Sequence, residues 1–234
     1  MSEKPTVSFF LPVRKGSQRV INKSTRPFAD LSGGLLELKL RQLLSSQHLH
    51  EIVLSTNDEE AIRIAKSIED PNKKIRIERR PDHLCVDTTA LSDLILYVPS
   101  IIQQGHILWG HVTTPFVLGG DYDQVIEQYW IELGKGHDSL LSVSTFQNFL
   151  LNSQGKVFNS DSDEFQWPRT QDLPTLYEVN HAVFMAPRSI YIEKNNRLGV
   201  NPALYKMDKI KSWDIDWEDD FTMAEAIYEK LRKL

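Results

Sequence analysis

Short apolar segments alternate with amphipathic helical patterns along most of this chain of 234 residues. Residues 7–13, 52–55 and 107–112 are largely apolar runs, as expected for strands buried on both faces. Between them, apolar residues recur at helical spacing. This alternation predicts an α/β fold of three layers, with a mostly parallel sheet and helices on both faces. The length fits one domain over residues 1–234.

The remaining elements follow from the same patterns. Helices are predicted over residues 36–44, 61–68, 91–102, 121–133, 190–194 and 218–233, and further strands over 75–78, 139–143, 182–185 and 204–207. From about residue 146 to 176 the sequence becomes polar and acidic and contains proline. We expect an inserted arm there, which acts as a lid, as a small β-rich extension or as a dimer contact.

Composition excludes several classes of protein. No run of 18 apolar residues exists, so no membrane span is expected. The first five residues carry no apolar signal segment, which predicts a cytoplasmic protein. Cys85 is the single cysteine, which rules out an intramolecular disulfide. A net charge of −5 argues against nucleic acid as a partner.

The segment after the first predicted strand is strongly basic, against the acidic background of the chain. Its cations are Arg14, Lys15, Arg19, Lys23 and Arg26. No acidic residue stands between residues 3 and 30. Ligands of open α/β sheets bind beyond the carboxyl ends of the strands. Gly16 lets a ligand approach the backbone closely, and Ser17 adds a hydroxyl. The loop therefore favours a polyanion such as a triphosphate, although a solvated basic loop would look similar.

Asp214 and Asp216 form an acid-x-acid pair between two tryptophans. In an extended segment both side chains point to the same face, and two such carboxylates can hold one hard cation. Mg²⁺ prefers one or two carboxylates together with phosphate oxygens and water. The pair is therefore a candidate magnesium site. Alternatively, Asp216 caps the helix that begins near residue 218, with Asp219 completing the capping pattern.

Two further polar clusters follow predicted strands. In the first, Arg80 can reach a base or a phosphate, and Asp87, Thr88 and Thr89 can bond a pyrimidine edge, although an ordinary turn explains them equally well. The second closes the polar arm. Its side chains that suit a polyhydroxylated ligand are Gln171 and Asn180. A surface loop is the alternative there.

Other site patterns are missing from the sequence. It contains no Walker motif and no Gly-x-Ser-x-Gly elbow, so the basic loop is not a P-loop. His106, His111 and His181 lack the spacing of zinc ligands. We expect these three histidines to be packed or solvent-facing rather than ligands.

Taken in order, the motifs resemble those of the acylneuraminate cytidylyltransferase (CMP-sialic acid synthetase) family. Residues 12–23 resemble its opening Pro-Ala-Arg-x-Gly-Ser-Lys-Arg-Ile-Pro-Asn-Lys loop, and 53–58 its Val-Ser-Thr-Asp signature. Residues 80–87 follow Arg-Pro-x-x-Leu-x-x-Asp, and 113–115 stand at its Thr-Ser-Pro. Residues 171–182 are similar to its Gln-x-Leu-Pro and Asn-Gly-Ala-Ile-Tyr region, and 214–225 to its terminal Asp-Ile-Asp-x-x-x-Asp and Ala-Glu motifs. The resemblance spans nearly the whole chain.

The resemblance implies a nucleotidyltransferase-like fold and activation of a 3-deoxy-ulosonic (sialic-acid-like, nonulosonic) sugar by CTP, giving the CMP-sugar and pyrophosphate. It implies that Arg14, Gly16, Ser17, Arg19 and Lys23 hold the triphosphate, with Arg14, Lys23 and Asp216 as catalytic residues. The cytidine would be surrounded by Arg80, Asp87, Thr88 and Thr89. The sugar pocket would be lined by Thr113, Gln171, Tyr177, Glu178 and Asn180. Mg²⁺ would be carried by Asp214 and Asp216. It also implies a homodimer in which the arm at 146–176 crosses to the partner.

Several positions depart from the family pattern. The common Lys is replaced by Gln18, the common Pro by Ile21, the common Asn by Ser24 and the common Arg by Val117. In addition, a frequent Gln is replaced by His111, and the usual Gly by His181. Glu178 stands where sialic acid enzymes often carry an Arg near the substrate carboxylate. A glutamate there repels a carboxylate. The hypothesis is therefore a different ulosonic acid, one carrying a cationic amino group.

Two other readings remain open from the sequence. Another sugar nucleotidyltransferase or a metal-dependent glycosyltransferase would also use a nucleotide-binding sheet and an acid-x-acid metal site. Glycosyltransferases, however, usually place that pair in mid-chain. A non-catalytic nucleotide or sugar sensor on the same fold would tolerate Gln18 and Val117. Such a sensor has less need of the pair Asp214 and Asp216.

Overall fold

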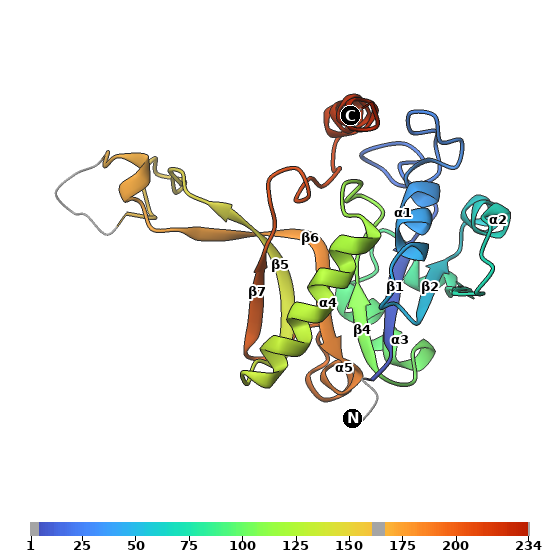
Figure 1. Ribbon diagram of the computed structural model, residues 1–234. Coiled ribbons are helices and arrows are strands. Elements are labelled where there is room, and N and C mark those ends of the chain that lie inside the picture. Colours follow the sequence, from blue (N-terminus) through green and yellow to red (C-terminus); the bar gives the residue numbers. More distant parts are fainter. Residues whose placement is uncertain (1–4, 161–166, 234) are drawn as a thin grey trace.

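The computed structural model of the chain describes residues 5–160 and 167–233, and a seven-stranded sheet forms its centre (Figure 1). The strands are β1 (Val7–Val13), β2 (Glu51–Thr56), β3 (Ile75–Arg79), β4 (His106–Trp109), β5 (Ser139–Phe146), β6 (Leu176–Pro187) and β7 (Pro202–Lys206). Their order in the sheet is β3-β2-β1-β4-β6-β5-β7. Only β6 is antiparallel to its neighbours, β4 and β5, while the other pairs are parallel. The predicted three-layer α/β fold with a mostly parallel sheet is confirmed.

Helices cover both faces of the sheet. They are α1 (Gly34–Leu44), α2 (Glu59–Ser67), α3 (Leu91–Ile101), α4 (Gly119–Gly134), α5 (Arg188–Lys194) and α6 (Glu218–Leu231). Alternation along β1 shows how the layers form: Phe9 and Leu11 pack with the apolar faces of α1, α2, α4 and α6. Phe10 points the other way, toward α3 and α5. Burial on both faces explains why β1 reads as a continuous apolar run.

The predicted elements agree with the structure apart from their ends. Strand β4 ends at Trp109 rather than at residue 112. The chain leaves the sheet at Gly110, where an added Cβ would lie 2.5 Å from the Phe9 ring. A turn follows, closed by the Thr114 hydroxyl, which donates a hydrogen bond to the His111 carbonyl at 3.1 Å. Helix α2 begins at Glu59, two residues before the predicted start, because the Asp58 carboxylate caps it by accepting a hydrogen bond from the Glu60 amide at 3.0 Å.

The inserted segment forms a β-rich arm, the second of the three expected forms. Strands β5 and β6 are longer than predicted because they continue past the body as an antiparallel ribbon, which projects to one side in Figure 1. A bridge between Leu151 and Val157 and a 3₁₀ turn at Thr170–Asp172 lie farther out. Residues 161–166 of the predicted arm lie outside the described residues.

Candidate active site

A cavity of about 250 Å³ opens at the carboxyl edge of the sheet, between the basic loop after β1 and the segment after β4. Five of the residues predicted to bind the nucleotide or the sugar line it: Arg14, Ser17, Arg19, Lys23 and Thr113. This is the crevice in which ligands of open α/β sheets bind. We call it the basic cavity.

The basic loop is folded by its own polar contacts. Gly16 has a φ of +78°, a left-handed conformation that suits glycine, and its Cα faces open space. The Ser17 hydroxyl donates to the Val20 carbonyl at 2.5 Å and accepts from the Lys23 amide at 2.9 Å. Val20 is buried and Ser17 fixes the turn, so the loop has a defined fold, although Lys15 and Arg19 remain exposed.

Lys23 and Arg19 face the late acidic segment. The Lys23 ammonium donates to the Ile215 carbonyl at 2.6 Å and lies 3.8 Å from the Asp216 carboxylate. Arg19 pairs with the same carboxylate at 2.7 Å and lies over the Trp217 ring. Burial lowers the pKa of the Lys23 ammonium, which Asp216 partly counteracts. Residues nearly 200 positions apart in the sequence thus meet beside one cavity.

Asp214 lies deeper than Asp216. The Ile215 amide donates to the Thr113 carbonyl at 2.9 Å, and the Thr113 side chain lies near the Asp214 carboxyl. Burial raises the pKa of the Asp214 carboxyl, which the Thr113 side chain partly offsets, and the neighbouring charge of Asp216 raises it further. One Asp214 carboxylate oxygen, Oδ1, is buried and has no hydrogen-bond partner among the described residues.

The alternative role of Asp216 as a helix cap is wrong. Helix α6 is capped at Trp217, and Asp220 completes the capping box. The Asp220 carboxylate accepts from the amides of Asp216 and Trp217 at 3.0 and 2.8 Å. Asp219 makes neither contact. The Asp216 side chain is thereby left to the two cations of the basic loop.

The donor set of the acidic pair fits a hard cation such as Mg²⁺. The unpartnered oxygen of Asp214 and the nearby carboxylate of Asp216 would supply the one or two protein ligands that Mg²⁺ commonly uses, with phosphate oxygens and water as the remainder. Residues 5–160 and 167–233 contain no group of three or more His, Cys, Asp or Glu side chains arranged for a metal. A cation here therefore depends on a substrate for its other ligands.

The turn after β4, which carries Thr113, is anchored from α1. The buried Lys39 ammonium donates to the carbonyls of Thr114 and Val117 at 2.7 and 3.4 Å, and to the Tyr122 hydroxyl at 3.0 Å. The Gln42 side chain donates to the Pro115 carbonyl at 2.6 Å. Burial lowers the pKa of Lys39 to about 7. The anchored turn fixes Thr113 and, through it, the Ile215 amide. Nothing in the sequence marked Lys39 as part of the site.

A second cavity, of about 660 Å³, lies on the arm side of the acidic segment. Glu178 and Asp214 line it, together with Ser144, Lys209 and Ser212. We call it the arm-side cavity. Asn180, predicted to bind the sugar, is instead buried beside it: its amide oxygen accepts from Ser142 at 2.5 Å and its amide nitrogen donates to Ser212 at 3.1 Å. Asn180 thus ties β5 to the acidic segment.

The predicted base-binding cluster is divided between two environments. Arg80 is buried and donates to the carbonyls of Val13 and Ser55 at 2.7 and 3.1 Å, so it ties together the ends of β1 and β2. Asp87 is exposed and accepts from Arg14 and from Gln18. Gln18, a departure from the family pattern, therefore has a partner.

The other predicted ligands lie away from both cavities. Thr88 is exposed, and the Thr89 hydroxyl donates to the His83 carbonyl at 3.0 Å. Gln171 belongs to the arm, where its carbonyl accepts from Gln147 at 3.2 Å. The Tyr177 ring lies 5.0 Å from the Lys206 ammonium. Within the described part of the chain, none of these four lines the basic or the arm-side cavity.

Residues 9–234 match the family model described as Cytidylyltransferase. The chain belongs to the cytidylyltransferase family. A Campylobacter coli protein named post-translational flagellin modification protein B is 25% identical over 228 residues, which cover 93% of this chain and 92% of the relative. A pseudaminic acid cytidylyltransferase from Campylobacter jejuni subsp. jejuni is 24% identical over 229 residues, 94% of each chain.

Solved structures agree on the fold of this cytidylyltransferase. A CMP:2-keto-3-deoxy-manno-octonic acid synthetase complexed with CTP superimposes with a TM-score of 0.66 at 12% identity, covering 96% of this chain and 99% of that one. The resemblance seen in the motifs is confirmed. The chain is a nucleotidyltransferase enzyme.

Two histidines of the cytidylyltransferase lie beside the site, although their spacing gave no metal signal. His111 lines the basic cavity, and its ring centroid is 6.3 Å from that of His181. His181 has a φ of +58°, a left-handed conformation that explains why the family usually has glycine there. The sequence signals for this histidine pair were the two departures from the family pattern, at positions 111 and 181. His106, the third candidate, instead contacts the Tyr129 hydroxyl at 2.7 Å.

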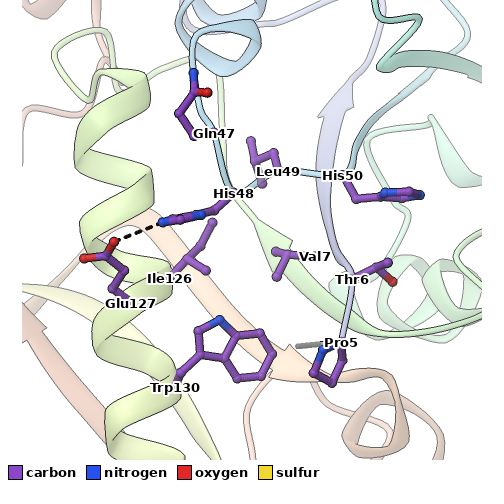
Figure 2. A pocket seen from close by; sticks show the side chains of 10 residues that line it. All are labelled: Pro5, Thr6, Val7, Gln47, His48, Leu49, His50, Ile126, Glu127 and Trp130. Carbon is purple, nitrogen blue, oxygen red and sulfur yellow. Dashed lines mark hydrogen bonds and ion pairs between the residues drawn. The ribbon is translucent and has the colours of Figure 1, made fainter. Parts of the chain in front are cut away.

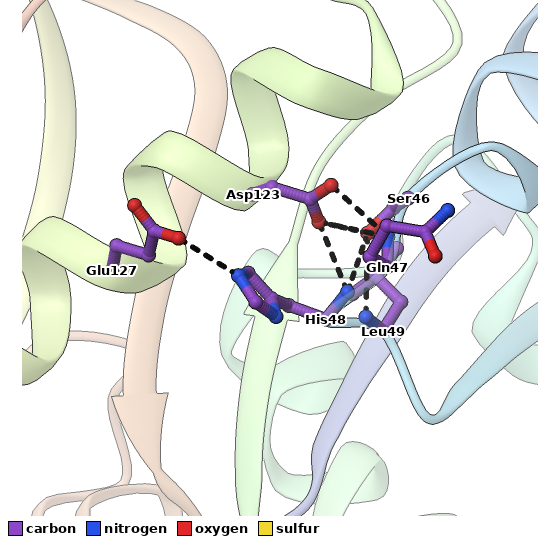
Figure 3. A network of polar contacts seen from close by, with 6 residues as sticks. All are labelled: Ser46, Gln47, His48, Leu49, Asp123 and Glu127. Atoms are coloured by element: carbon purple, nitrogen blue, oxygen red, sulfur yellow. Dashed lines mark hydrogen bonds and ion pairs between the residues drawn. The ribbon is translucent and has the colours of Figure 1, made fainter.

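A separate cavity of about 330 Å³ lies at the amino-terminal edge of the sheet (Figure 2). There His48 pairs with Glu127 of α4 at 3.0 Å, with Trp130 and Pro5 nearby. Figure 3 shows Asp123 of α4 accepting hydrogen bonds from the segment before β2, the shortest from the Ser46 hydroxyl at 2.5 Å. These contacts fasten α4 to the α1–β2 connection. They lie at the opposite edge from the basic cavity.

No helix among the described residues is both long enough and apolar enough to cross a membrane.

Proposed function

We propose that this cytidylyltransferase transfers CMP from CTP to the anomeric hydroxyl of a nonulosonic acid of the pseudaminic acid type. One observation carries the proposal: Lys23 and Arg19 meet Asp216 at the mouth of the basic cavity, beside Asp214. The name of the C. jejuni relative and its coverage of 94% of this chain support the acceptor class.

The two cavities suit the two substrates. Arg14, Arg19 and Lys23 supply the positive charge that a triphosphate requires, and Gly16 and Ser17 shape the loop around it. The arm-side cavity is less basic and larger, as a nine-carbon sugar needs. Asp214 lines the arm-side cavity, and Asp216 faces the cations of the basic cavity. The acidic segment therefore lies between the two cavities, where the acceptor hydroxyl must reach the α-phosphate.

In the reaction we infer, the anomeric hydroxyl oxygen bonds to the α-phosphorus of CTP, the bond from that phosphorus to the bridging oxygen breaks, and pyrophosphate leaves while the hydroxyl proton is released. Arg14, Arg19 and Lys23 neutralise the charge that gathers on the phosphates, so catalysis consists mainly of positioning and charge stabilisation. Asp214 and Asp216 would hold Mg²⁺, which polarises phosphate oxygens when bound. Thr113 fixes the acidic segment through the Ile215 amide.

Glu178 bears on the acceptor. Its side chain lines the arm-side cavity, where a carboxylate ligand would be repelled. We propose that the Glu178 carboxylate accepts a hydrogen bond from an N–H group of the sugar, either an acylamino group or a free ammonium. Replacement by arginine is expected to change the order of preference among acceptors, and an unchanged order would contradict the assignment.

We also propose that the enzyme is a cytoplasmic homodimer in which the arm contacts the partner. The arm exposes large apolar side chains, with Phe158 and Trp167 each about 60% accessible in the single chain. Such residues on a projecting ribbon are typical of an interface. A Phe158→Asp variant should lower the molar mass measured by light scattering from that of a dimer to that of a monomer. A monomeric unmodified protein would refute the dimer.

The activity is tested by incubating the protein with CTP and Mg²⁺ and with pseudaminic acid, N,N′-diacetyllegionaminic acid, N-acetylneuraminic acid or 2-keto-3-deoxy-manno-octonic acid. Pyrophosphate release and the mass of the CMP-sugar are measured. We expect the highest kcat/KM with pseudaminic acid. Asp216→Asn should remove the activity, whereas the matched control Asp219→Asn, which alters an exposed carboxylate on α6, should retain it.

Two results would count against this function. CTP binding without pyrophosphate release from any acceptor would favour a non-catalytic nucleotide-binding protein. Release with a sugar 1-phosphate instead of an ulosonic acid would favour another class of sugar nucleotidyltransferase.

A further inference from the structure

Lys39 is a fully buried lysine of α1 that forms no ion pair among the described residues. Burial lowers the pKa of its ammonium group to about 7, and the negative charge of Asp121 in α4 opposes that change. Asp121 itself pairs with Lys211 at 2.6 Å. An apolar side chain in place of Lys39 would avoid the cost of burying a charge. The presence of a lysine here is therefore not explained by stability alone.

The donors of Lys39 act mainly on the turn after β4. Its ammonium nitrogen lies 2.7 Å from the Thr114 carbonyl oxygen and 3.4 Å from that of Val117. Gln42 lies three residues further along α1, on the same face of the helix, and donates to the Pro115 carbonyl at 2.6 Å. Two side chains of α1 thus hold three carbonyl groups of a single turn.

The turn has open space behind it. A cavity of about 530 Å³ is lined by Pro115, Phe116 and Leu118 of the turn, and by Leu38 and Gln42 of α1. Close packing fixes a segment only where atoms fill the space beside it. On this side the hydrogen bonds from α1, rather than packing, therefore determine where the turn lies.

The turn in turn holds the acidic segment. The buried Ile215, between the two aspartates, donates its amide to the Thr113 carbonyl at 2.9 Å. The Ile215 carbonyl accepts from the Lys23 ammonium at 2.6 Å. The backbone that carries Asp214 and Asp216 is thus held between the turn and the basic loop. A displacement of the turn would pass through Thr113 to both carboxylates.

We propose that Lys39 is a positioning residue for nucleotidyl transfer, which holds the turn after β4 and thereby sets the place of Asp214 and Asp216 beside the basic cavity. This inference rests on the proposed function. An ammonium group has three N–H donors, enough to bind both carbonyls of the turn and the Tyr122 hydroxyl together. Phosphoryl transfer depends largely on positioning, and a displacement of about 1 Å lowers its rate on the order of a hundredfold.

The kinetic test compares Lys39→Met and Gln42→Leu with the unmodified enzyme at pH 7, using CTP, Mg²⁺ and pseudaminic acid. Both variants remove an anchor of the same turn, but only the first removes a charge. We expect kcat for pyrophosphate release to fall about tenfold or more in Lys39→Met, and by a smaller factor in Gln42→Leu. The KM for CTP should change by less than about threefold, because the basic loop is folded by Ser17 and not by the turn.

Hydrogen exchange of the Ile215 amide, followed by NMR, gives a second readout that needs neither turnover nor metal. The hydrogen bond to Thr113 should protect this amide in the unmodified protein. In Lys39→Met its protection should fall about tenfold or more, while the amides of β2 keep theirs. A merely structural loss of stability would instead affect both segments.

Ser46→Ala is the matched control. It removes a buried hydroxyl that donates to Asp123 of α4 at 2.5 Å, so it weakens the contact between the α1–β2 connection and α4 at the opposite edge of the sheet. The variant should have a lower melting temperature but an unchanged kcat and an unchanged exchange rate at Ile215.

Three outcomes separate the proposals. Unchanged protection of Ile215 in Lys39→Met overturns the positioning role and leaves the proposed function standing. A fall of kcat in Lys39→Met without any fall in Gln42→Leu also overturns it, because the charge of Lys39 then acts on the phosphates through space. Absence of pyrophosphate release from the unmodified enzyme with every acceptor refutes the proposed function, while exchange at Ile215 still decides whether Lys39 holds the acidic segment.

Discussion

Replacing Lys39 with methionine should change how the stability of the enzyme depends on pH. Lys39 is fully buried in α1, and its ammonium group donates to two carbonyls of the turn after β4 and to the Tyr122 hydroxyl. Burial lowers its pKa from 10.5 to about 7. The folded state therefore binds fewer protons than the unfolded state between these two values. Under that condition the free energy of unfolding increases as the pH rises.

The size of the effect follows from the two pKa values. One unit of pKa difference corresponds to about 1.4 kcal/mol, so the full penalty for charging Lys39 in the folded state is about 5 kcal/mol, present below pH 7. By pH 9 only about 2 kcal/mol of that penalty is left, since the folded state has lost the proton and the unfolded state has not. Lys39 thus contributes a gain of about 2–3 kcal/mol between pH 6 and pH 9.

Lys39→Met removes this gain. At pH 6 the variant avoids the buried charge but leaves two carbonyls and a hydroxyl without a donor, each costing about 1–3 kcal/mol, so the two effects nearly cancel. At pH 9 the unpaired groups dominate, and the variant should be about 2–3 kcal/mol less stable than the unmodified protein. Urea unfolding at pH 6, 7, 8 and 9 measures the difference. Lys135→Met, which removes an exposed lysine, is the control and should show no such trend. Equal differences at all four pH values would refute a lowered pKa of Lys39.

The other predictions concern the site directly. Lys23→Met should raise the KM for CTP at least tenfold, as for loss of a charge-assisted phosphate contact. The control Lys15→Met, which changes an exposed lysine in the same loop, should have little effect on initial rates. Equal losses of activity in the two variants would contradict the assignment of Lys23 to the triphosphate. His181→Gly should raise the free energy of unfolding by roughly 0.5–1 kcal/mol because it relieves a left-handed backbone, and a lower melting temperature would argue the reverse. Chelation by EDTA should abolish pyrophosphate release and added Mg²⁺ should restore it, whereas full activity in EDTA would exclude the metal.

Much of the fold could be predicted because a strand that is buried on both faces is apolar along its whole length. Residues 7–13 read as a parallel strand, since Phe9 and Phe10 each have an apolar layer to enter. The ends of elements were harder to predict, because they depend on contacts distant in sequence. Strand β4 stops where Gly110 meets Phe9, and β6 runs on into the arm through pairing with β5. Neither partner is visible in the local pattern.

The site was predictable where chemistry is concentrated in one segment. The basic loop and the acid-x-acid pair were found by composition and spacing, and the structure brings Lys23 and Asp216 together. Single residues were missed when their function depends on an environment assembled by the fold. Lys39 looks like any helical lysine until α1 is placed against the turn after β4.

The reversed direction of β6 has an evolutionary consequence. The strands on one side of the β4–β6 seam all come from residues 7–109, and the basic loop follows the first of them, whereas the strands on the other side come from residues 139–206 and carry Glu178. If the proposed function holds, mutations in β5 and β6 can accordingly change the acceptor sugar while the basic loop stays intact. Enzymes with this topology can therefore acquire a new acceptor specificity through substitutions in the strands on one side of the sheet.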